Sequence, residues 1–171
     1  MNKYKIMEIF FENPLEELHL REIARRTKLS PNTVMNINKV LVKQGLLLKA
    51  KKRHIVAFKA NIDNINFINE KKLFNLRNIY DSNIVEYLAD LYNNPSAIIL
   101  FGSYSKGEDN AKGDIDIAVL TKRKEKANLD IFERKLKRSV HLLEVDIDNI
   151  SKEFLNSLIN GIVLHGYLSL K

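Results

Sequence analysis

Cysteine is absent from the 171-residue chain, which excludes disulfides, thiolate zinc sites and cysteine nucleophiles. Any metal must therefore be held by carboxylates or histidines, and such ligands favour a hard cation. The chain also lacks an apolar run of about eighteen residues, and Glu8 and Glu12 interrupt the apolar pattern at its start. We therefore expect a cytoplasmic protein with no membrane span and no secretory signal.

Acidic residues are scarce in the first part of the chain. Residues 1–60 contain 13 Lys and Arg against five Asp and Glu, a net charge of +8, whereas residues 61–171 contain 15 against 16. This asymmetry predicts a polyanion-binding module attached to a near-neutral one, because basic side chains that neutralise phosphates release condensed counterions. A solvated basic surface is the alternative interpretation.

Three helices are expected in the first sixty residues. Apolar residues at helical spacing run from Lys5 to the break at Asn13-Pro14, and His19 to Leu29 forms a second amphipathic pattern. Ser30 and Pro31 suit the N-cap and first position of a third helix, which ends at Gly45. The inward positions of this third helix are expected to be Val34, Ile37, Val40 and Leu41.

A strand at Leu46–Leu48, a basic turn at Lys49–His54 and a returning strand at Ile55–Lys59 complete the pattern. Residues 2 to about 60 thus resemble the winged helix-turn-helix family of DNA-binding domains. The resemblance implies base contacts from the third helix and phosphate contacts from basic side chains; a protein-interaction module is the alternative. The DNA-binding candidates are Arg25, Arg26, Asn32, Thr33, Asn36, Lys39, Lys51, Lys52 and Arg53.

Residues 61–82 carry apolar positions at intervals that predict a helical connector rather than a flexible linker. A second domain is expected at residues 83–171. The predicted fold class is therefore α+β with two domains, a winged helix-turn-helix followed by a small mixed-sheet α/β domain. A helical pattern continues from Ile84 and stops at Asn93-Asn94-Pro95.

The second domain contains a motif with clear chemistry. Ala97–Phe101 is an apolar run typical of a buried strand, and it leads into Gly102-Ser103. A short helical turn closed by Gly107, a polar loop and a strand from Asp114 to Leu120 follow. Glycine admits a phosphate close to the backbone, and Asp114 and Asp116 share a strand face where they can bridge divalent cations. The motif predicts a site that holds a nucleoside triphosphate with its metal.

The spacing of Gly102, Ser103, Gly107, Asp114 and Asp116 resembles the signature of the DNA polymerase beta-like nucleotidyltransferase superfamily, especially its minimal stand-alone members. Gly113 stands where that family often has serine. The resemblance extends over residues 84–168. It implies that Asp114 and Asp116 are catalytic metal ligands and that Gly102, Ser103, Lys106 and Gly107 bind the nucleotide.

The family resemblance also implies a third carboxylate on a later strand, and here the chain departs from the pattern. The simplest alignment puts His141 at that position. Asp146 is the second choice for a third metal ligand and Glu144 is a further alternative, although both would face away from His141 in a regular strand.

Two functions remain open from the sequence. One is transfer of a nucleoside monophosphate from a triphosphate, ATP above all, to a hydroxyl with Mg²⁺ or Mn²⁺; by analogy with minimal family members the acceptor is a protein such as a HEPN-type toxin. The other is a DNA-binding transcriptional regulator whose nucleotidyltransferase-like domain binds nucleotide or is structural, without catalysis. Double-stranded DNA is the expected partner of the N-terminal domain, and a homodimer on two half-sites is a further expectation.

Overall fold

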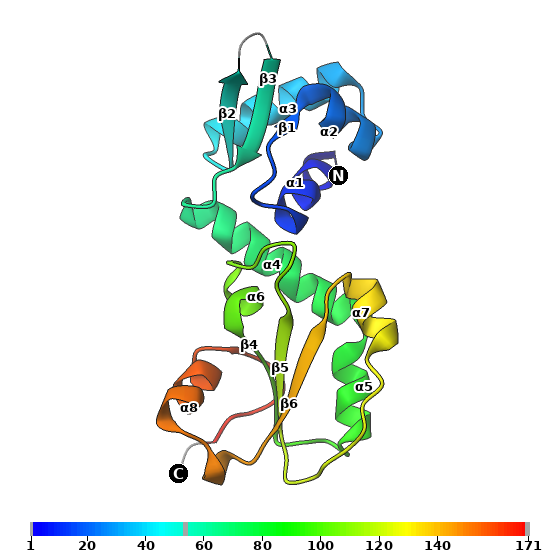
Figure 1. The fold of residues 1–171 in the computed structure, drawn as a ribbon, viewed down its shortest axis with the longest axis vertical. Coiled ribbons are helices and arrows are strands. Elements are labelled where there is room, and N and C mark those ends of the chain that lie inside the picture. The colour runs from blue at the N-terminus through cyan, green and yellow to red at the C-terminus, as the bar shows by residue number, and fades with distance from the viewer. Residues whose placement is uncertain (1, 53–54, 170–171) are drawn as a thin grey trace. The chain divides into compact units, whose positions relative to one another are not determined.

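The chain forms two compact units, Met1–Phe74 and Asn75–Lys171 (Figure 1). The computed structural model describes residues 2–52 and 55–169, without the side chains of Lys51, Lys52 and Ile55. The boundary between the units falls inside helix α4 (Ile65–Ser82), which occupies most of the predicted connector. The prediction of a helix within residues 61–82 is therefore confirmed.

The helices within residues 2–52 follow the predicted order. They are α1 (Asn2–Glu12), α2 (Leu20–Thr27) and α3 (Pro31–Lys43). Ser30 caps α3 as expected, because its hydroxyl accepts a hydrogen bond from the Thr33 N–H at 3.1 Å. Lys28, at φ +57°, ends α2, so α2 and α3 are joined by only three residues.

The inward face of α3 differs from the prediction in two places. Val34, Asn38 and Leu41 are fully buried, whereas Val40 is 52% exposed. Val40 was therefore assigned to the wrong face. The buried residues recur at i, i+4 and i+7, and this stripe turns position 40 towards solvent and draws the polar Asn38 into the core.

A three-stranded antiparallel sheet completes the first unit, in the order β1-β3-β2. Its strands are β1 (Leu18–His19), β2 (Leu47–Lys52) and β3 (Ile55–Ala60). The predicted basic turn at residues 49–54 is wrong for Lys49–Lys52, since these residues pair with β3 and extend β2. The sequence reading also missed β1, where two residues pair with Phe58 and Ala57.

The second unit is built on a four-stranded mixed sheet in the order β6-β5-β4-β7 (Figure 1). Its strands are β4 (Ala97–Phe101), β5 (Ile115–Leu120), β6 (Val140–Val145) and β7 (Ile162–Gly166). Strand β5 runs antiparallel to β4 and parallel to β6. The helical segments are α5 (Ile84–Leu91), α6 (Gly102–Lys106), α7 (Asp130–Leu136), the 3₁₀ turn η1 (Ile147–Asn149) and α8 (Lys152–Ile159).

Each face of this sheet has its own apolar core. On one face Ile115, Ile117 and Val119 pack with residues of α5 and α7 and with Ile79 of α4. On the other face Ala118 and Leu120 pack with Leu158 of α8. Because strand side chains alternate, Asp116 belongs to the second face. The molecule is thus of the mixed α and β class, and no helix among residues 2–52 and 55–169 has the length and apolar character to cross a membrane.

Candidate functional site

The sheet register brings the two halves of the Gly-Ser and Asp-x-Asp motif to the same place. Strands β4 and β5 are antiparallel neighbours, with Phe101 opposite Asp116. The chain leaves β4 directly at Gly102, and Asp114 lies immediately before β5. The end of β4 and the start of β5 therefore share one edge, so residues that are twelve or more positions apart in the sequence become spatial neighbours.

Gly102 packs directly against the carboxylate of Asp116. Its φ of +73° lies in the left-handed region that favours glycine, and a Cβ built on it would overlap Asp116 Oδ2 and lie 3.2 Å from Cγ. Any larger residue would thus have to move the Asp116 side chain. The glycine is required both for its backbone conformation and for this close approach.

The short helix α6 displays the polar side chains of the motif. Ser103 and Lys106 are exposed, while Tyr104 and Ser105 are buried beneath them. Gly107, at φ +73°, ends the helix as the sequence predicts. The hydroxyl of Ser105 donates to the Gly102 carbonyl at 2.8 Å and stiffens the turn.

His141 is the side chain that β6 adds to Asp116. The parallel register places His141 opposite Asp116, and His141 Nδ1 lies 3.2 Å from Asp116 Oδ1. The side chain of Asp116 is 28% exposed and that of His141 is 59% exposed, so the pair is open to solvent. His141 thus lies beside the Asp-x-Asp motif on the same sheet face.

Glu144 and Asp146 are not brought to this site. Glu144 accepts hydrogen bonds from the Tyr92 hydroxyl at 2.9 Å and from the Glu125 N–H at 2.7 Å. Asp146 follows the last residue of β6, roughly 16 Å along the strand from His141 at about 3.3 Å per residue, and caps η1. The sequence reading of Asp146 as a third metal ligand therefore has no geometric support, because the two positions are at opposite ends of β6.

Glu144 instead anchors the segment that precedes α7. Besides the contacts with Tyr92 and Glu125, it pairs with Lys124 Nζ at 3.1 Å, and its side chain is 15% exposed. Burial acts to raise the pKa of Glu144, but the three donors outweigh burial and hold that pKa below its usual range. Burial and the Glu144 carboxylate together raise the pKa of Tyr92.

A buried ion pair, which the sequence reading missed, anchors the loop that leads to Asp114. Arg138 Nη2 lies 3.2 Å from Asp109 Oδ2, with side-chain exposures of 9% and 0%. The other Asp109 oxygen accepts from Asn75 Nδ2 at 2.7 Å, and Arg138 also donates to the carbonyl of Asn110. The backbone of Ile115 donates to Ser139 O at 2.9 Å. The segment after α7 thus fixes both the loop and the strand on either side of Asp114.

Among the described residues, no three His, Asp or Glu side chains converge closely enough to hold a metal by themselves. Asp114, Asp116 and His141 nevertheless supply oxygen and nitrogen donors at one sheet edge. These donor types fit a divalent cation that takes its remaining ligands from water or phosphate. Within the described residues these donors do not form a closed protein cage for a metal.

In the first unit, the predicted DNA-contacting residues of α3 differ in their exposure to solvent. Asn32, Asn36 and Lys39 are exposed on this helix. Thr33 is half-buried, and its hydroxyl shares a hydrogen bond of 2.8 Å with the Ser30 hydroxyl. Thr33 therefore contributes to the helix cap, while the other three residues extend from the surface.

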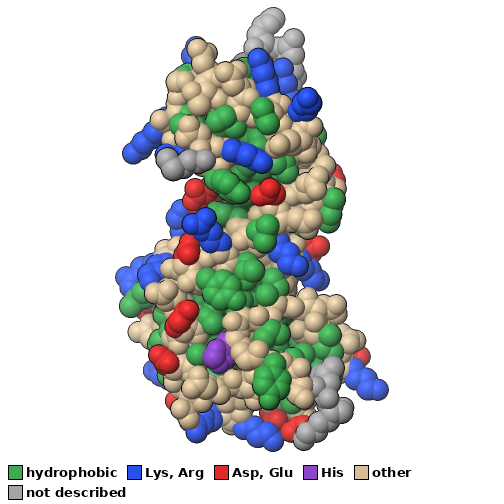
Figure 2. Space-filling model, turned by 180° about the vertical axis from the view of Figure 1, so that it is seen from behind, with side chains coloured by type: hydrophobic (Ala, Val, Ile, Leu, Met, Phe, Trp, Pro, Cys, Tyr) green, Lys and Arg blue, Asp and Glu red, His purple; other side chains and the backbone are tan. Residues whose placement is uncertain are grey.

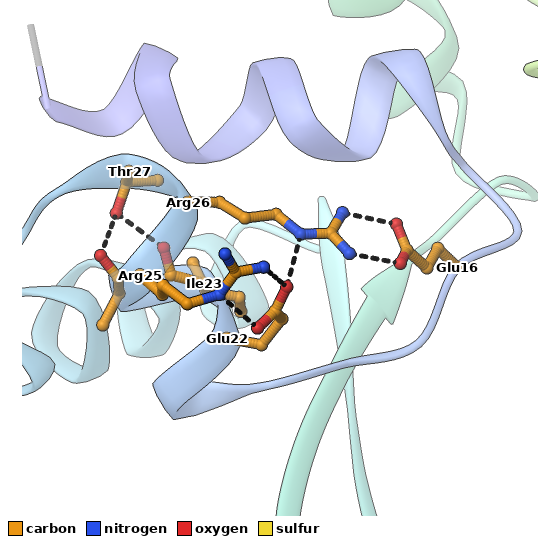
Figure 3. A network of polar contacts seen from close by, with 7 residues as sticks. Glu16, Glu22, Ile23, Arg25, Arg26 and Thr27 are labelled. Atoms are coloured by element: carbon orange, nitrogen blue, oxygen red, sulfur yellow. Dashed lines mark hydrogen bonds and ion pairs between the residues drawn. The ribbon is translucent and has the colours of Figure 1, made fainter.

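Arg25 and Arg26 are engaged in ion pairs (Figure 3). Arg26 binds both oxygens of Glu16, at 2.6 and 2.8 Å, and also Glu22, so it ties α2 to the segment before β1. Arg25 binds Glu22 at 2.7 Å but remains 74% exposed. The bonds from Arg25 and Arg26 lower the pKa of Glu22 to about 2. Arg26 is thus bound within the protein, whereas Arg25 is accessible.

Three further DNA-binding candidates follow in the sequence, and the structure describes them only in part. Lys51 and Lys52 belong to β2, but their side chains are not described, and Arg53 lies outside the described residues. On the face of the molecule in Figure 2, Lys and Arg side chains are interspersed with other residue types and do not merge into one continuous patch.

The comparisons with known proteins bear on the second unit. A family model described as "Polymerase beta, Nucleotidyltransferase" matches residues 82–168, a little over half of the chain. The match spans β4, α6, β5 and β6, and so includes the whole Gly102 to Asp116 motif. No curated protein and no solved structure matches the chain.

Proposed function

Because the chain belongs to the polymerase beta nucleotidyltransferase family through residues 82–168, we propose that it transfers a nucleoside monophosphate from a nucleoside triphosphate to a hydroxyl acceptor. The observation that supports this most is the packing of Gly102 against Asp116. This contact joins the turn that suits phosphate to the carboxylate that suits metal. We expect ATP as the triphosphate.

In the proposed reaction, Gly102 lets the triphosphate approach the backbone, and the exposed Ser103 and Lys106 supply a hydroxyl and a positive charge to its oxygens. Asp114 and Asp116 would hold Mg²⁺ or Mn²⁺. Such an ion, when bound, favours deprotonation of the attacking hydroxyl and offsets the charge that develops on the pyrophosphate. The Arg138 anchor keeps the loop before Asp114 fixed, so the carboxylates need little rearrangement.

The acceptor in this proposal is a protein hydroxyl, such as one on a HEPN-type toxin, by analogy with minimal members of the family. The decisive test incubates the protein with labelled ATP, Mg²⁺ or Mn²⁺ and candidate acceptors. Wild type is compared with Asp114→Asn/Asp116→Asn and with Asp148→Asn, which removes an exposed carboxylate beyond the other end of β6. We expect label transfer by wild type and Asp148→Asn alone; transfer that persists in the double variant would contradict the assignment.

For the first unit we propose a winged helix-turn-helix that binds double-stranded DNA, with residues 1–60 as its domain and 83–171 as the transferase domain. The three-residue connection from α2 to α3, the β2-β3 hairpin and the net charge of +8 support this. In the proposed complex Asn32 and Asn36 read base edges, and Lys39 and the hairpin cations contact phosphates. Arg25 would join them, whereas Arg26 would first have to leave Glu16.

Duplex binding measured against salt tests the DNA proposal. Each phosphate contact contributes a slope of about −0.9 to the logarithmic salt dependence, so Lys39→Gln should make the slope shallower by about one. Lys72→Gln removes an exposed lysine of α4 and serves as the matched control. An affinity that is insensitive to salt, or equal slopes in the two variants, would argue against a phosphate-contacting α3.

His141 beside Asp116 also favours a second function. In this alternative the protein is a DNA-binding transcriptional regulator whose second unit binds nucleotide without turnover, since an imidazole stands where the family has a third carboxylate. Nucleotide binding by wild type, lost in Asp114→Asn/Asp116→Asn, together with no label transfer to any acceptor, would favour the regulator over the enzyme.

A further inference from the structure

We infer that Asp116 and His141 form a mixed oxygen and nitrogen ligand pair that makes the site select a divalent transition ion, Mn²⁺, over Mg²⁺. The inference rests on the proposed function, because it concerns the metal of the same site. It also assigns His141 a defined role as a ligand that replaces a carboxylate.

The geometry of the pair suits two ligands of one ion. Strands β5 and β6 are parallel neighbours, and their register places Asp116 and His141 side by side with their side chains on one face. Asp116 Oδ1 and His141 Nδ1 are 3.2 Å apart. Two ligand atoms at about 2.1 to 2.2 Å from an ion, at a right angle, lie roughly 3 Å from each other. A shared ion therefore requires only a small displacement of either side chain.

The surroundings of the pair leave room for the remaining ligands. His141 is 59% exposed, Asp116 is 28% exposed, and the exposed Asp114 lies two residues before Asp116. Because Asp114 and His141 are both exposed, water and phosphate oxygens have access. The arrangement favours an ion of six ligands that keeps several exchangeable positions.

The chemistry of the donors sets the preference. Mg²⁺ binds carboxylate and water oxygens and gains little from an imidazole, whereas first-row transition ions accept imidazole nitrogen readily. Among these ions Mn²⁺ is the one that shares the preference of Mg²⁺ for carboxylate and water oxygens, and as a first-row transition ion it also binds sites that contain nitrogen. Replacing one oxygen ligand by nitrogen therefore weakens the binding of Mg²⁺ relative to that of Mn²⁺. If His141 only forms a hydrogen bond with Asp116, it will have no effect on which metal ion the site prefers.

The test measures metal binding directly on the full chain. Isothermal titration gives the affinities for Mn²⁺ and Mg²⁺, each with a non-hydrolysable ATP analogue, for wild type, His141→Ala, His141→Asp and the control His165→Ala. His141→Ala should weaken Mn²⁺ binding about tenfold or more, since even residues that only support a metal ligand contribute that much to affinity. The affinity for Mg²⁺ should change far less. His141→Asp should lower the Mn²⁺ to Mg²⁺ preference about tenfold.

Pulsed electron paramagnetic resonance of bound Mn²⁺ supplies a second readout that does not depend on activity. We expect coupling to a ¹⁴N nucleus in wild type and His165→Ala, and its absence in both His141 variants. Bound Mn²⁺ without such coupling in wild type, an unchanged metal preference in His141→Asp, or no Mn²⁺ binding at all would overturn the inference. Label transfer that needs Asp114 and Asp116 but is unaffected in His141→Ala would leave the proposed function intact while the metal inference fails.

Discussion

The buried pair of Arg138 and Asp109 leads to a quantitative prediction for Arg138→Met. This change keeps much of the side-chain volume but leaves a fully buried carboxylate without its guanidinium. Removal of one partner of a buried ion pair costs about 3 to 5 kcal/mol. We therefore expect the free energy of opening of the second unit to fall by that amount. The effect should reach β5, because Arg138 also binds the Asn110 carbonyl in the loop before this strand.

Native-state hydrogen exchange of the β5 amides is the appropriate assay, because it reports on the second unit independently of the first. Arg134→Met removes an exposed arginine of α7 and should change the free energy by less than about 0.5 kcal/mol. The double variant Asp109→Asn/Arg138→Met should recover much of the loss, since it removes both charges and leaves an amide oxygen for Asn75. A loss below about 1 kcal/mol in Arg138→Met, or no recovery in the double variant, would refute the reasoning.

Three further changes have defined outcomes. Asn38→Leu should stabilise the first unit by about 1 to 3 kcal/mol in thermal unfolding, because both polar atoms of this buried amide lack a partner among the described residues. Gly102→Ala should destabilise the second unit by about 1 to 2 kcal/mol at its positive φ and should weaken metal binding in titration, because the new Cβ displaces Asp116. Glu144 has a pKa lowered by folding, so its stabilisation is present above the ordinary carboxyl pKa and is lost as pH falls through the lower, folded pKa. Unfolding measured against pH should show this acid loss in wild type and less of it in Glu144→Gln.

Much of the second unit could be predicted from local patterns. The apolar run at Ala97–Phe101 and the alternation after Asp114 are both short-range signals, and each forms the expected strand. Glycine at 107 likewise ends a helical turn for a local reason, its positive φ. Such features depend on residues within a few positions of one another, which is why a sequence alone reveals them.

The features that escaped prediction depend on distant partners. Arg138 and Asp109 are 29 residues apart, and neither has a neighbour in sequence that marks it as buried. In α3 the polar Asn38 is buried in the core, whereas the apolar Val40 is exposed. Hydrophobicity alone therefore predicted the wrong buried face for this part of the helix. Strand alternation already put Glu144 and Asp146 on the opposite face from His141, but only the register of β6 against β5 shows which residue of β6 lies beside Asp116. In each case tertiary packing, rather than local preference, decides the outcome.

The two carboxylates of the motif are not equivalent in this structure. Asp116 lies within β5, against Gly102 and beside His141, so the positions of its oxygens are determined by three adjacent segments. Asp114 precedes the strand and is exposed, and its place depends on the loop that Arg138 anchors. Asp116 is therefore held by direct contacts with its neighbours, whereas Asp114 is held through the anchored loop that precedes it. In the proposed reaction both carboxylates would therefore need little rearrangement, Asp116 because of its direct contacts and Asp114 because of the Arg138 anchor.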